Sequence, residues 1–330
     1  MLVKTMTTGW KPGYIHLHEQ GLLENRALAL QELANPCCLC PRRCGVDRPS
    51  GERGFCRAGA RVQVAKALPH MGEEPAISGK RGAGTIFFTH CNLRCCFCQN
   101  YQISHEHLGR EINTEELAGM MIDLQNRGCH NISLVSGAHF LPGILKALVA
   151  ATSRGLHVPL VYNSNGYESL QVLRLLDGII DVYLPDAKYC SDSMAQRLSA
   201  APNYHQINMA ALREMARQTT HLETDEEGVA LRGLIIRHLV LPDGLGDTYR
   251  VLQAIKKNLG PFVAVSLMGQ YTPCFEAADS PVLGRYIRAE EYRRACTMLV
   301  ELGFENGWLQ ECEQKDRSFV PDFSQLDSWN

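Results

Sequence analysis

Short apolar or β-branched runs alternate with helical stretches over most of this 330-residue chain, and this alternation restricts the fold more than any other feature. A strand followed by a helix, repeated along one chain, requires right-handed crossovers and a parallel sheet. We therefore predict an α/β fold, either an open doubly wound sheet or a closed or partly closed barrel. The predicted strands are residues 85–90, 131–136, 158–163, 180–185, 234–242 and 261–268.

The region before the first predicted strand has a different character. Apolar residues at helical spacing predict a helix over residues 18–34 that ends at Asn35-Pro36. Residues 37–84 are rich in Gly, Pro, Arg and Cys with little periodicity, which indicates a small irregular module. The predicted organisation is an N-terminal helical segment (1–35), a Cys-rich metal-binding module (36–84), the α/β domain (85–311) and a C-terminal tail (312–330).

Polar residues stand at or just beyond the ends of several predicted strands. The carboxyl ends of parallel strands meet at one edge of a sheet or one mouth of a barrel, and ligands bind there. Random placement would scatter such residues, so they predict one site assembled from several strands. They are Thr89-His90-Cys91, Ser136-Gly137, Asn163-Ser164-Asn165, Asp186-Ala187-Lys188 and Gln270-Tyr271.

A cysteine triplet follows the first predicted strand. Cys91, Cys95 and Cys98 have the spacing C-x3-C-x2-C, and Cys96 falls off that spacing. Three thiolates can hold three irons of a [4Fe-4S] cluster and leave the fourth iron open, whereas electron-transfer cubanes usually use four. A zinc site or three buried cysteines are the alternatives, but zinc prefers four ligands.

A second cysteine group lies in the irregular module. Cys37, Cys40, Cys44 and Cys56 have the spacing C-x2-C-x3-C-x11-C in a stretch with few apolar residues. Metal binding supplies folding energy to such segments, so the group indicates a metal site. Zinc and an auxiliary [4Fe-4S] cluster both take four thiolates, and the ligand count leaves both metals open.

Composition excludes several classes of protein. Fourteen Cys in a long chain without an apolar leader fit thiolate ligation better than a disulfide scaffold. A net charge of −2 from dispersed acids and bases offers no basic face for nucleic acid, and no stretch is apolar enough for a membrane span. We expect a cytoplasmic protein, with the scattered cysteines, such as Cys129, Cys190, Cys296 and Cys312, buried as small hydrophobes.

The segment CNLRCCFCQN resembles the signature of the radical S-adenosylmethionine (SAM) superfamily. Further segments resemble its pyruvate formate-lyase activating enzyme branch, in particular the PflX-like group, and the likeness covers about residues 36–310. They are CCLCPRRCGVDRPSGERGFC, HMGEEPAISGKRGAGTIFF, DVYLPDAKYC, HLVLPDGLGDT and SLMGQYTP. This resemblance implies a partial (β/α)6 TIM-like barrel with SAM lying across its mouth.

The resemblance also implies which residues contact SAM. Asp186 and Lys188 resemble an Asp-x-Lys motif at the methionine end of SAM, and Arg237 is a candidate for its carboxylate. Asn163 and Asn165 stand where polar groups reach the ribose or carboxylate, and the aromatic ring of Phe97 could pack against adenine.

One turn departs from the family pattern. Ser136-Gly137-Ala138-His139 replaces a Gly-Gly-Glu-like turn, so backbone carbonyls rather than an acidic side chain would receive the amino group of SAM. His139 either faces substrate or is structural. His70, Glu73 and Glu74 either line the site or only join the two modules.

The implied activity is reductive cleavage of SAM to a 5'-deoxyadenosyl radical that abstracts hydrogen, as in glycyl-radical activating enzymes. A reductant such as flavodoxin or ferredoxin and a protein substrate are the implied partners. Activating enzymes generally lack the Cys-rich module, so a maturation enzyme acting on another protein or a small molecule is an alternative. A non-catalytic iron-sulfur or zinc-binding module is the alternative from another class.

Overall fold

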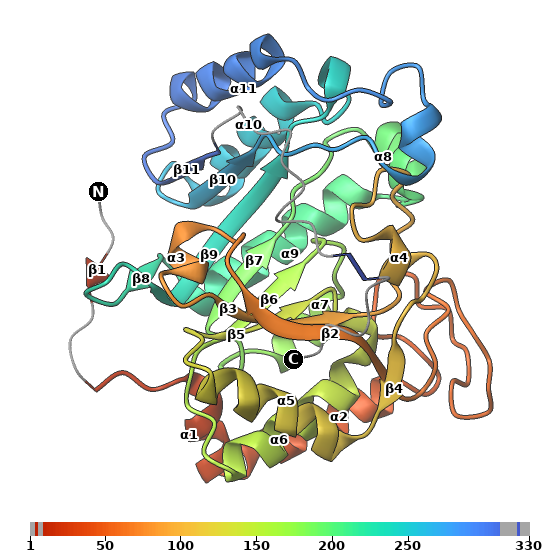
Figure 1. Ribbon diagram of the computed structural model, residues 1–330, viewed down its shortest axis with the longest axis vertical. Coiled ribbons are helices and arrows are strands. Elements are labelled where there is room, and N and C mark those ends of the chain that lie inside the picture. Colours follow the sequence, from red (N-terminus) through yellow and green to blue (C-terminus); the bar gives the residue numbers. More distant parts are fainter. Residues whose placement is uncertain (1–3, 6–8, 311–321, 324–330) are drawn as a thin grey trace.

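The computed structural model describes residues 4–5, 9–310 and 322–323, and a sheet of parallel strands runs through its centre (Figure 1). All six predicted strands are present, which confirms the α/β fold with a parallel sheet. Their order in the sheet follows their order in the chain, which is the order of a barrel rather than of a doubly wound sheet. The strands are β3 (Ala83–Phe88), β5 (Ile132–Val135), β6 (Leu160–Ser164), β7 (Val182–Pro185), β9 (Ala230–Leu239) and β10 (Ala264–Met268).

Shorter or antiparallel strands extend this sheet at its margins. At one end, β2 (Val62–His70) pairs antiparallel with β3 and then with β4 (Arg110–Ile112). At the other end, β11 (Gly307–Leu309) pairs parallel with β10, while β8 (Glu223–Thr224) joins β9 to β1 (Lys4–Thr5). Among the described residues no pairing joins β4 to β11, so the sheet forms an open, partial barrel.

Strand β2 lies within residues 36–84 and nevertheless belongs to the main sheet. It pairs with β3 from Val64 to His70, so the irregular part of that module ends near Arg61. The periodicity was too weak to reveal it because only its first residues alternate between buried and partly exposed positions. Most of the predicted tail (312–330), including Cys312, lies outside the described residues, although Phe323 packs on Phe87 with ring centroids 5.2 Å apart.

The longer helices pack on one face of the sheet around a continuous core, whereas short α3 lies against the other face. Helices α1, α2, α5 and α6 gather beside β5 in Figure 1. The described residues include three short 3-10 helices, η1 (Ala138–Phe140), η2 (Pro242–Gly244) and η3 (Phe275–Asp279). No helix in the described part of the chain is both long and apolar enough to cross a membrane. The α-helices are α1 (Gly13–Glu19), α2 (Leu22–Leu33), α3 (Pro75–Ser78), α4 (Tyr101–Ser104), α5 (Thr114–Asn126), α6 (Leu141–Ser153), α7 (Leu170–Leu175), α8 (Asp192–Ser199), α9 (Tyr204–Thr219), α10 (Thr248–Leu259) and α11 (Ala289–Glu301).

Local sequence explains where several helices begin and end. The predicted helix over 18–34 is divided into α1 and α2 at Gly21, whose φ of 67° lies in the left-handed region that glycine tolerates. Helix α2 ends at Leu33, just before Asn35-Pro36, as predicted. Helix α5 begins with a capping box in which Asn113 Oδ1 accepts from Glu116 N and Glu116 Oε2 accepts from Asn113 N, both at 2.9 Å.

The capping box of α5 leads to a stability prediction. Asn113→Ala removes the acceptor for a backbone N–H and should lower the free energy of unfolding by about 1 kcal/mol. Ser169→Ala is the matched control because Ser169 precedes α7 without a side-chain cap. Thermal unfolding followed by circular dichroism checks both variants, and equal effects of the two substitutions would contradict the role of the Asn113 cap.

Candidate active site

A cavity of about 540 Å³ opens at the carboxyl ends of the parallel strands. It brings together residues from six strand ends or from the loops that follow them. Each of the five predicted strand-end groups contributes to the wall, but Thr89, His90 and Tyr271 do not line it. Gly137 does not line the cavity because it packs against Ile144 and Phe88 behind the strand end. The predicted residues on the cavity wall are Cys91, Cys95, Phe97, Cys98, Ser136, Asn163, Asn165, Asp186, Lys188 and Arg237.

The cysteine triplet lies in the loop between β3 and α4, and each thiol has a hydrogen-bond partner. Cys91 Sγ accepts from Asn165 Nδ2 at 3.3 Å, and Cys95 Sγ accepts from Ser199 Oγ at 3.0 Å. Cys98 Sγ lies 3.2 Å from Ser104 Oγ. Hydrogen bonds of this kind orient thiolate ligands and tune the metal that they hold.

Burial raises the pKa of Cys91, Cys95 and Cys98 to about 11 each, and the nearby thiols contribute to the shift. Lys188 acts in the opposite direction on Cys95 and Cys98. Thiols with such a pKa lose their protons at neutral pH when a metal binds, and metal binding therefore releases protons. Three mutually interacting thiols on one cavity wall are a suitable donor set for an iron–sulfur cluster with one open iron.

Both cysteine groups would have to tighten their loops around a metal. Within residues 4–5, 9–310 and 322–323, no three His, Cys, Asp or Glu side chains already stand close enough to hold a metal ion. Coupling of ligand arrangement to metal binding is usual for thiolate sites. Cys96 is not on the cavity wall, and its backbone N donates to Leu198 O at 2.9 Å.

Asp186 and Lys188 form an ion pair beside the triplet. Lys188 Nζ lies 2.6 Å from Asp186 Oδ2, and both side chains are largely buried. Burial opposes the charged form of Lys188, but its pKa is raised overall because Asp186 and Cys95 favour the ammonium. A fixed ammonium next to the cysteine loop is suited to attract an anionic group of a ligand.

The two predicted asparagines have different surroundings. Asn163 Nδ2 donates to Glu73 Oε1 at 3.2 Å, and its side chain remains partly exposed on the cavity wall. Asn165 is buried and donates to Asn92 Oδ1 at 2.7 Å as well as to Cys91. Asn165 therefore holds the triplet loop in place, whereas Asn163 is positioned to contact a ligand.

Arg237 is engaged by two carboxylates inside the cavity. Its guanidinium donates to Glu73 and, at 2.7 and 2.8 Å, to Glu74. Burial raises the pKa of Glu74 to about 7 and lowers that of Arg237 to about 9. Glu73, Glu74 and His70 line the cavity, so the segment between the two modules contributes to this site.

Sequence patterns did not identify the far wall of the cavity. Trp308 and Gln310 lie at β11, a three-residue strand too short to be found by periodicity. Tyr204 also escaped notice, although its hydroxyl lies 2.9 Å from Asn165 O and 3.1 Å from Asp186 O. Tyr204 is the first residue of α9 and follows no predicted strand, so its position in the sequence gave no signal of a role near the site.

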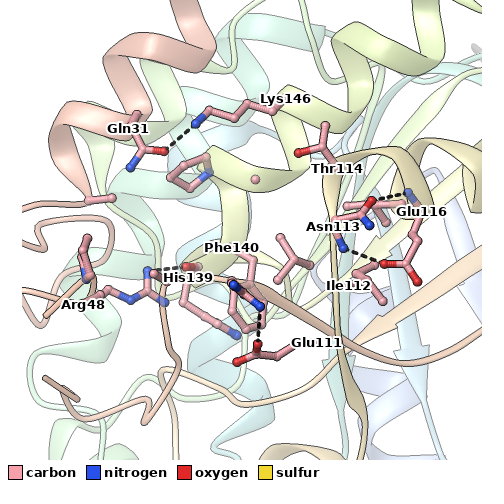
Figure 2. A pocket seen from close by; sticks show the side chains of 18 residues that line it. Gln31, Arg48, Glu111, Ile112, Asn113, Thr114, Glu116, His139, Phe140 and Lys146 are labelled. Carbon is pink, nitrogen blue, oxygen red and sulfur yellow. Dashed lines mark hydrogen bonds and ion pairs between the residues drawn. The ribbon is translucent and has the colours of Figure 1, made fainter. Parts of the chain in front are cut away.

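A second pocket of about 490 Å³ lies between the Cys-rich module, β4 and the start of α6 (Figure 2). His139 lines this pocket rather than the cavity with the cysteines. The imidazole Nε2 lies 2.8 Å from Thr89 O, and Arg48 Nη1 donates to His139 O at 2.7 Å. His139 thus fastens the end of β3 to the Cys-rich module and does not face the candidate active site.

Comparison with known proteins places the chain in a family. Residues 85–222 match the profile of the Radical SAM superfamily. The chain is 33% identical over 282 residues to "Uncharacterized protein MJ0674" of Methanocaldococcus jannaschii, covering 83% of this chain and 77% of that protein. The chain belongs to the radical SAM superfamily.

A solved structure is also similar in part. It is "Crystal structure of HydG: A maturase of the [FeFe]-hydrogenase", with a TM-score of 0.49 and 12% sequence identity. The similar region covers 74% of this chain and 55% of HydG, so this chain spans about half of that protein.

Gly166 gives a test of how closely the strand ends pack. A Cβ there would lie 2.1 Å from Asp186 O, and the φ of 75° is left-handed. Gly155 has a φ of 92° with no atom within 4 Å of its Cβ position. Gly155→Ala should lower the free energy of unfolding by about 1 kcal/mol, and Gly166→Ala should lower it clearly more. Thermal unfolding measures both, and equal losses would show that the close approach is unimportant.

Glu168 gives a prediction about pH. Burial raises its pKa to about 7 from an ordinary value of 4.5, so the folded state binds the proton more tightly than the unfolded state. Wild-type stability should therefore fall as pH rises between those values, by at most about 1.4 kcal/mol per pH unit. Glu168→Gln removes this contribution. The melting temperature of the variant minus that of wild type should therefore increase between about pH 5 and about pH 8. A constant difference would contradict the prediction.

Proposed function

We propose that this protein reductively cleaves SAM and uses the resulting radical to abstract hydrogen from a substrate. The observation that carries this proposal is the single cavity in which three hydrogen-bonded cysteines face the polar ends of neighbouring strands. Membership of the radical SAM superfamily supports an iron–sulfur cluster and SAM as the cofactors. A [4Fe-4S] cluster bound by Cys91, Cys95 and Cys98 would supply the electron that breaks a carbon–sulfur bond of SAM.

The residues of the chain then bind and orient SAM. Lys188, held by Asp186, presents a cation that can receive the carboxylate of the methionine moiety. Ser136 has a φ of 56° and follows β5 directly, so its backbone is turned at the cavity wall where a carbonyl can accept from an amino group. Phe97 packs near Tyr271, with ring centroids 6.0 Å apart, and supplies an aromatic surface for adenine.

The size of the cavity bears on the substrate. A volume of about 540 Å³ lies within the usual range for one drug-sized ligand, and SAM itself is a ligand of that size. The cavity also opens to solvent, so a substrate can approach SAM from outside. A backbone glycine of a protein is the substrate that we propose, in line with the resemblance to glycyl-radical activating enzymes. A reductant such as flavodoxin or ferredoxin would be the electron source.

Cleavage of SAM tests the proposal. After anaerobic reconstitution with iron and sulfide, the wild-type protein should form 5'-deoxyadenosine from SAM and dithionite, measured by liquid chromatography. Cys95→Ala should reduce the product to background because it removes one of three cluster ligands. Cys96→Ala is the matched control and should remain active. Absence of product from wild type, or equal loss in both variants, would overturn the proposal.

Binding of SAM gives a second test that does not require turnover. Lys188→Met should raise the Kd for SAM by about tenfold to a hundredfold, as expected from a lost charged hydrogen bond. Lys146→Met is the control because Lys146 lines the pocket of Figure 2 and not the cavity. Equilibrium dialysis with labelled SAM measures both, and an unchanged Kd for Lys188→Met would contradict the assigned contact.

A further inference from the structure

We propose that the pocket of Figure 2 binds a small organic acid, namely a carboxylate with a neighbouring hydroxyl group and an apolar body. Among the described residues, this pocket shares no lining residue with the cavity that contains the cysteine triplet. The two sites are therefore separate. The inference goes beyond the proposed function and does not depend on it.

Arg48 supplies the group that would receive the carboxylate. It is 5% exposed, and its Nε and Nη1 donate to Ala58 O at 3.3 Å and to His139 O at 2.7 Å. Its Nη2 is buried without a hydrogen-bond partner within residues 4–5, 9–310 and 322–323. A buried donor without a partner destabilises the folded protein, and a guanidinium matches the geometry of a carboxylate. An oxyanion at Nη2 would therefore satisfy a donor that the chain itself leaves unsatisfied.

His139 supplies an acceptor on the residue that Arg48 contacts. Its Nε2 lies 2.8 Å from Thr89 O, and a carbonyl oxygen only accepts, so Nε2 carries the proton. Burial lowers the pKa of His139 to about 3, so the ring is neutral at pH 7 and Nδ1 can accept a hydrogen bond. In the described part of the chain Nδ1 also has no partner. A hydroxyl group next to the carboxylate is a donor that fits this nitrogen.

The charges around the pocket favour a ligand with one negative charge. Three basic side chains and two acidic ones line it, namely Arg48, Arg61, Lys146, Glu111 and Glu116. Glu116 is already neutralised by Arg110, whose Nη1 lies 2.8 Å from Glu116 Oε1. Lys146 Nζ donates to a neutral amide oxygen, Gln31 Oε1, at 3.0 Å. The cations therefore exceed the anions by one, and a hydroxy acid balances them, whereas a zwitterionic amino acid adds no net charge.

An apolar wall adjoins the basic side chains. The guanidinium carbon of Arg48 lies 5.9 Å from the ring centroid of Phe140, so the charged and apolar parts of the pocket meet. A volume of about 490 Å³ lies within the usual range for small ligands. An acid with an aromatic or branched alkyl body would place this body on the apolar wall. The buried apolar residues that line the pocket are Val62, Ile112, Leu117, Phe140 and Pro142.

The pocket joins parts of the chain that are far apart in sequence. Figure 2 shows Arg48 beside His139 at one side of the pocket and Lys146 with Gln31 at another. Arg48 belongs to the Cys-rich module, whereas His139 and Lys146 belong to η1 and α6 of the barrel. A ligand here would contact the module and the barrel together. By mass action it should raise the melting temperature of the folded protein.

Calorimetric titration with phenyllactate tests the proposal on the reconstituted wild-type protein in the absence of SAM. Phenyllactate should bind with a Kd in the low millimolar range or below, as expected for a ligand of its size. Hydrocinnamate, which lacks the hydroxyl group, should bind about fivefold more weakly because it leaves His139 Nδ1 without a donor. Phenylpropanol, which lacks the carboxylate, and inorganic phosphate, which lacks the apolar body, should bind more weakly still. No binding of phenyllactate, or equal or tighter binding of phenylpropanol or phosphate, would overturn the proposal.

Arg48→Lys locates the bound carboxylate. It removes Nη2 but keeps the positive charge, and it should raise the Kd for phenyllactate at least about tenfold. Arg42→Lys is the matched control because Arg42 also belongs to the module and donates to backbone oxygens of the barrel, but does not line the pocket. Circular dichroism verifies that both variants are folded. Equal Kd values in the two variants would overturn the assignment of the carboxylate to Arg48.

Lys146→Met gives a test at an exposed side chain, where folding is not at risk. Loss of this cation should raise the Kd for phenyllactate about threefold, since a partly solvated charge contributes modestly. Lys257→Met is the control because Lys257 is exposed on α10 and does not line the pocket. Phenyllactate should also raise the melting temperature of wild type more than that of Lys146→Met. Equal Kd values for the two lysine variants would contradict binding in this pocket. None of these measurements uses SAM cleavage, so failure of the proposed function would leave their outcome unchanged.

Discussion

The side chain of Asn165 makes the contacts on which the candidate active site depends. It donates to Cys91 Sγ and to Asn92 Oδ1, and so fastens the loop after β3 to the loop after β6. The next residue, Gly166, approaches Asp186 so closely that a side chain there would meet its carbonyl oxygen. Three strand ends are thereby fixed relative to one another, and the cysteine thiols face the Asp186–Lys188 pair as a result.

The Cys-rich module is an integral part of this arrangement. Arg42 of the module and Arg94 of the cysteine-triplet loop both place their guanidinium groups near the ring of Phe55. Arg94 Nη2 also donates to Phe55 O at 3.0 Å. Arg48 adds a hydrogen bond from the module to His139 O. Guanidinium groups that donate to backbone oxygens stabilise irregular chain because each replaces a missing sheet or helix partner. The module and the triplet loop are thus expected to respond to each other.

Acidic and basic side chains in the cavity form two groups, and in one of them the carboxylates outnumber the cations. Lys188 is matched by Asp186, whereas Arg237 is shared between Glu73 and Glu74. Burial raises the pKa of Glu74, and the charge of Asp186 adds to the shift. A ligand with a positive group near Glu73 and Glu74 would relieve this excess.

The sequence by itself determined the α/β class, the six parallel strands and the cysteine triplet, because strand–helix alternation and thiolate spacing are local patterns. It also indicated that polar residues at strand ends would meet, since parallel strands bring their carboxyl ends together. Only the tertiary structure decided which of them face the cavity. Asn165 lies on the cavity wall but is held by the cysteine loop, Gly137 packs against the core, and His139 lines another pocket. Strands β2 and β11 add residues to the cavity wall, and Tyr204 supports the strand ends, through long-range contacts. Such contacts depend on chain segments far apart in sequence, and no local pattern encodes them.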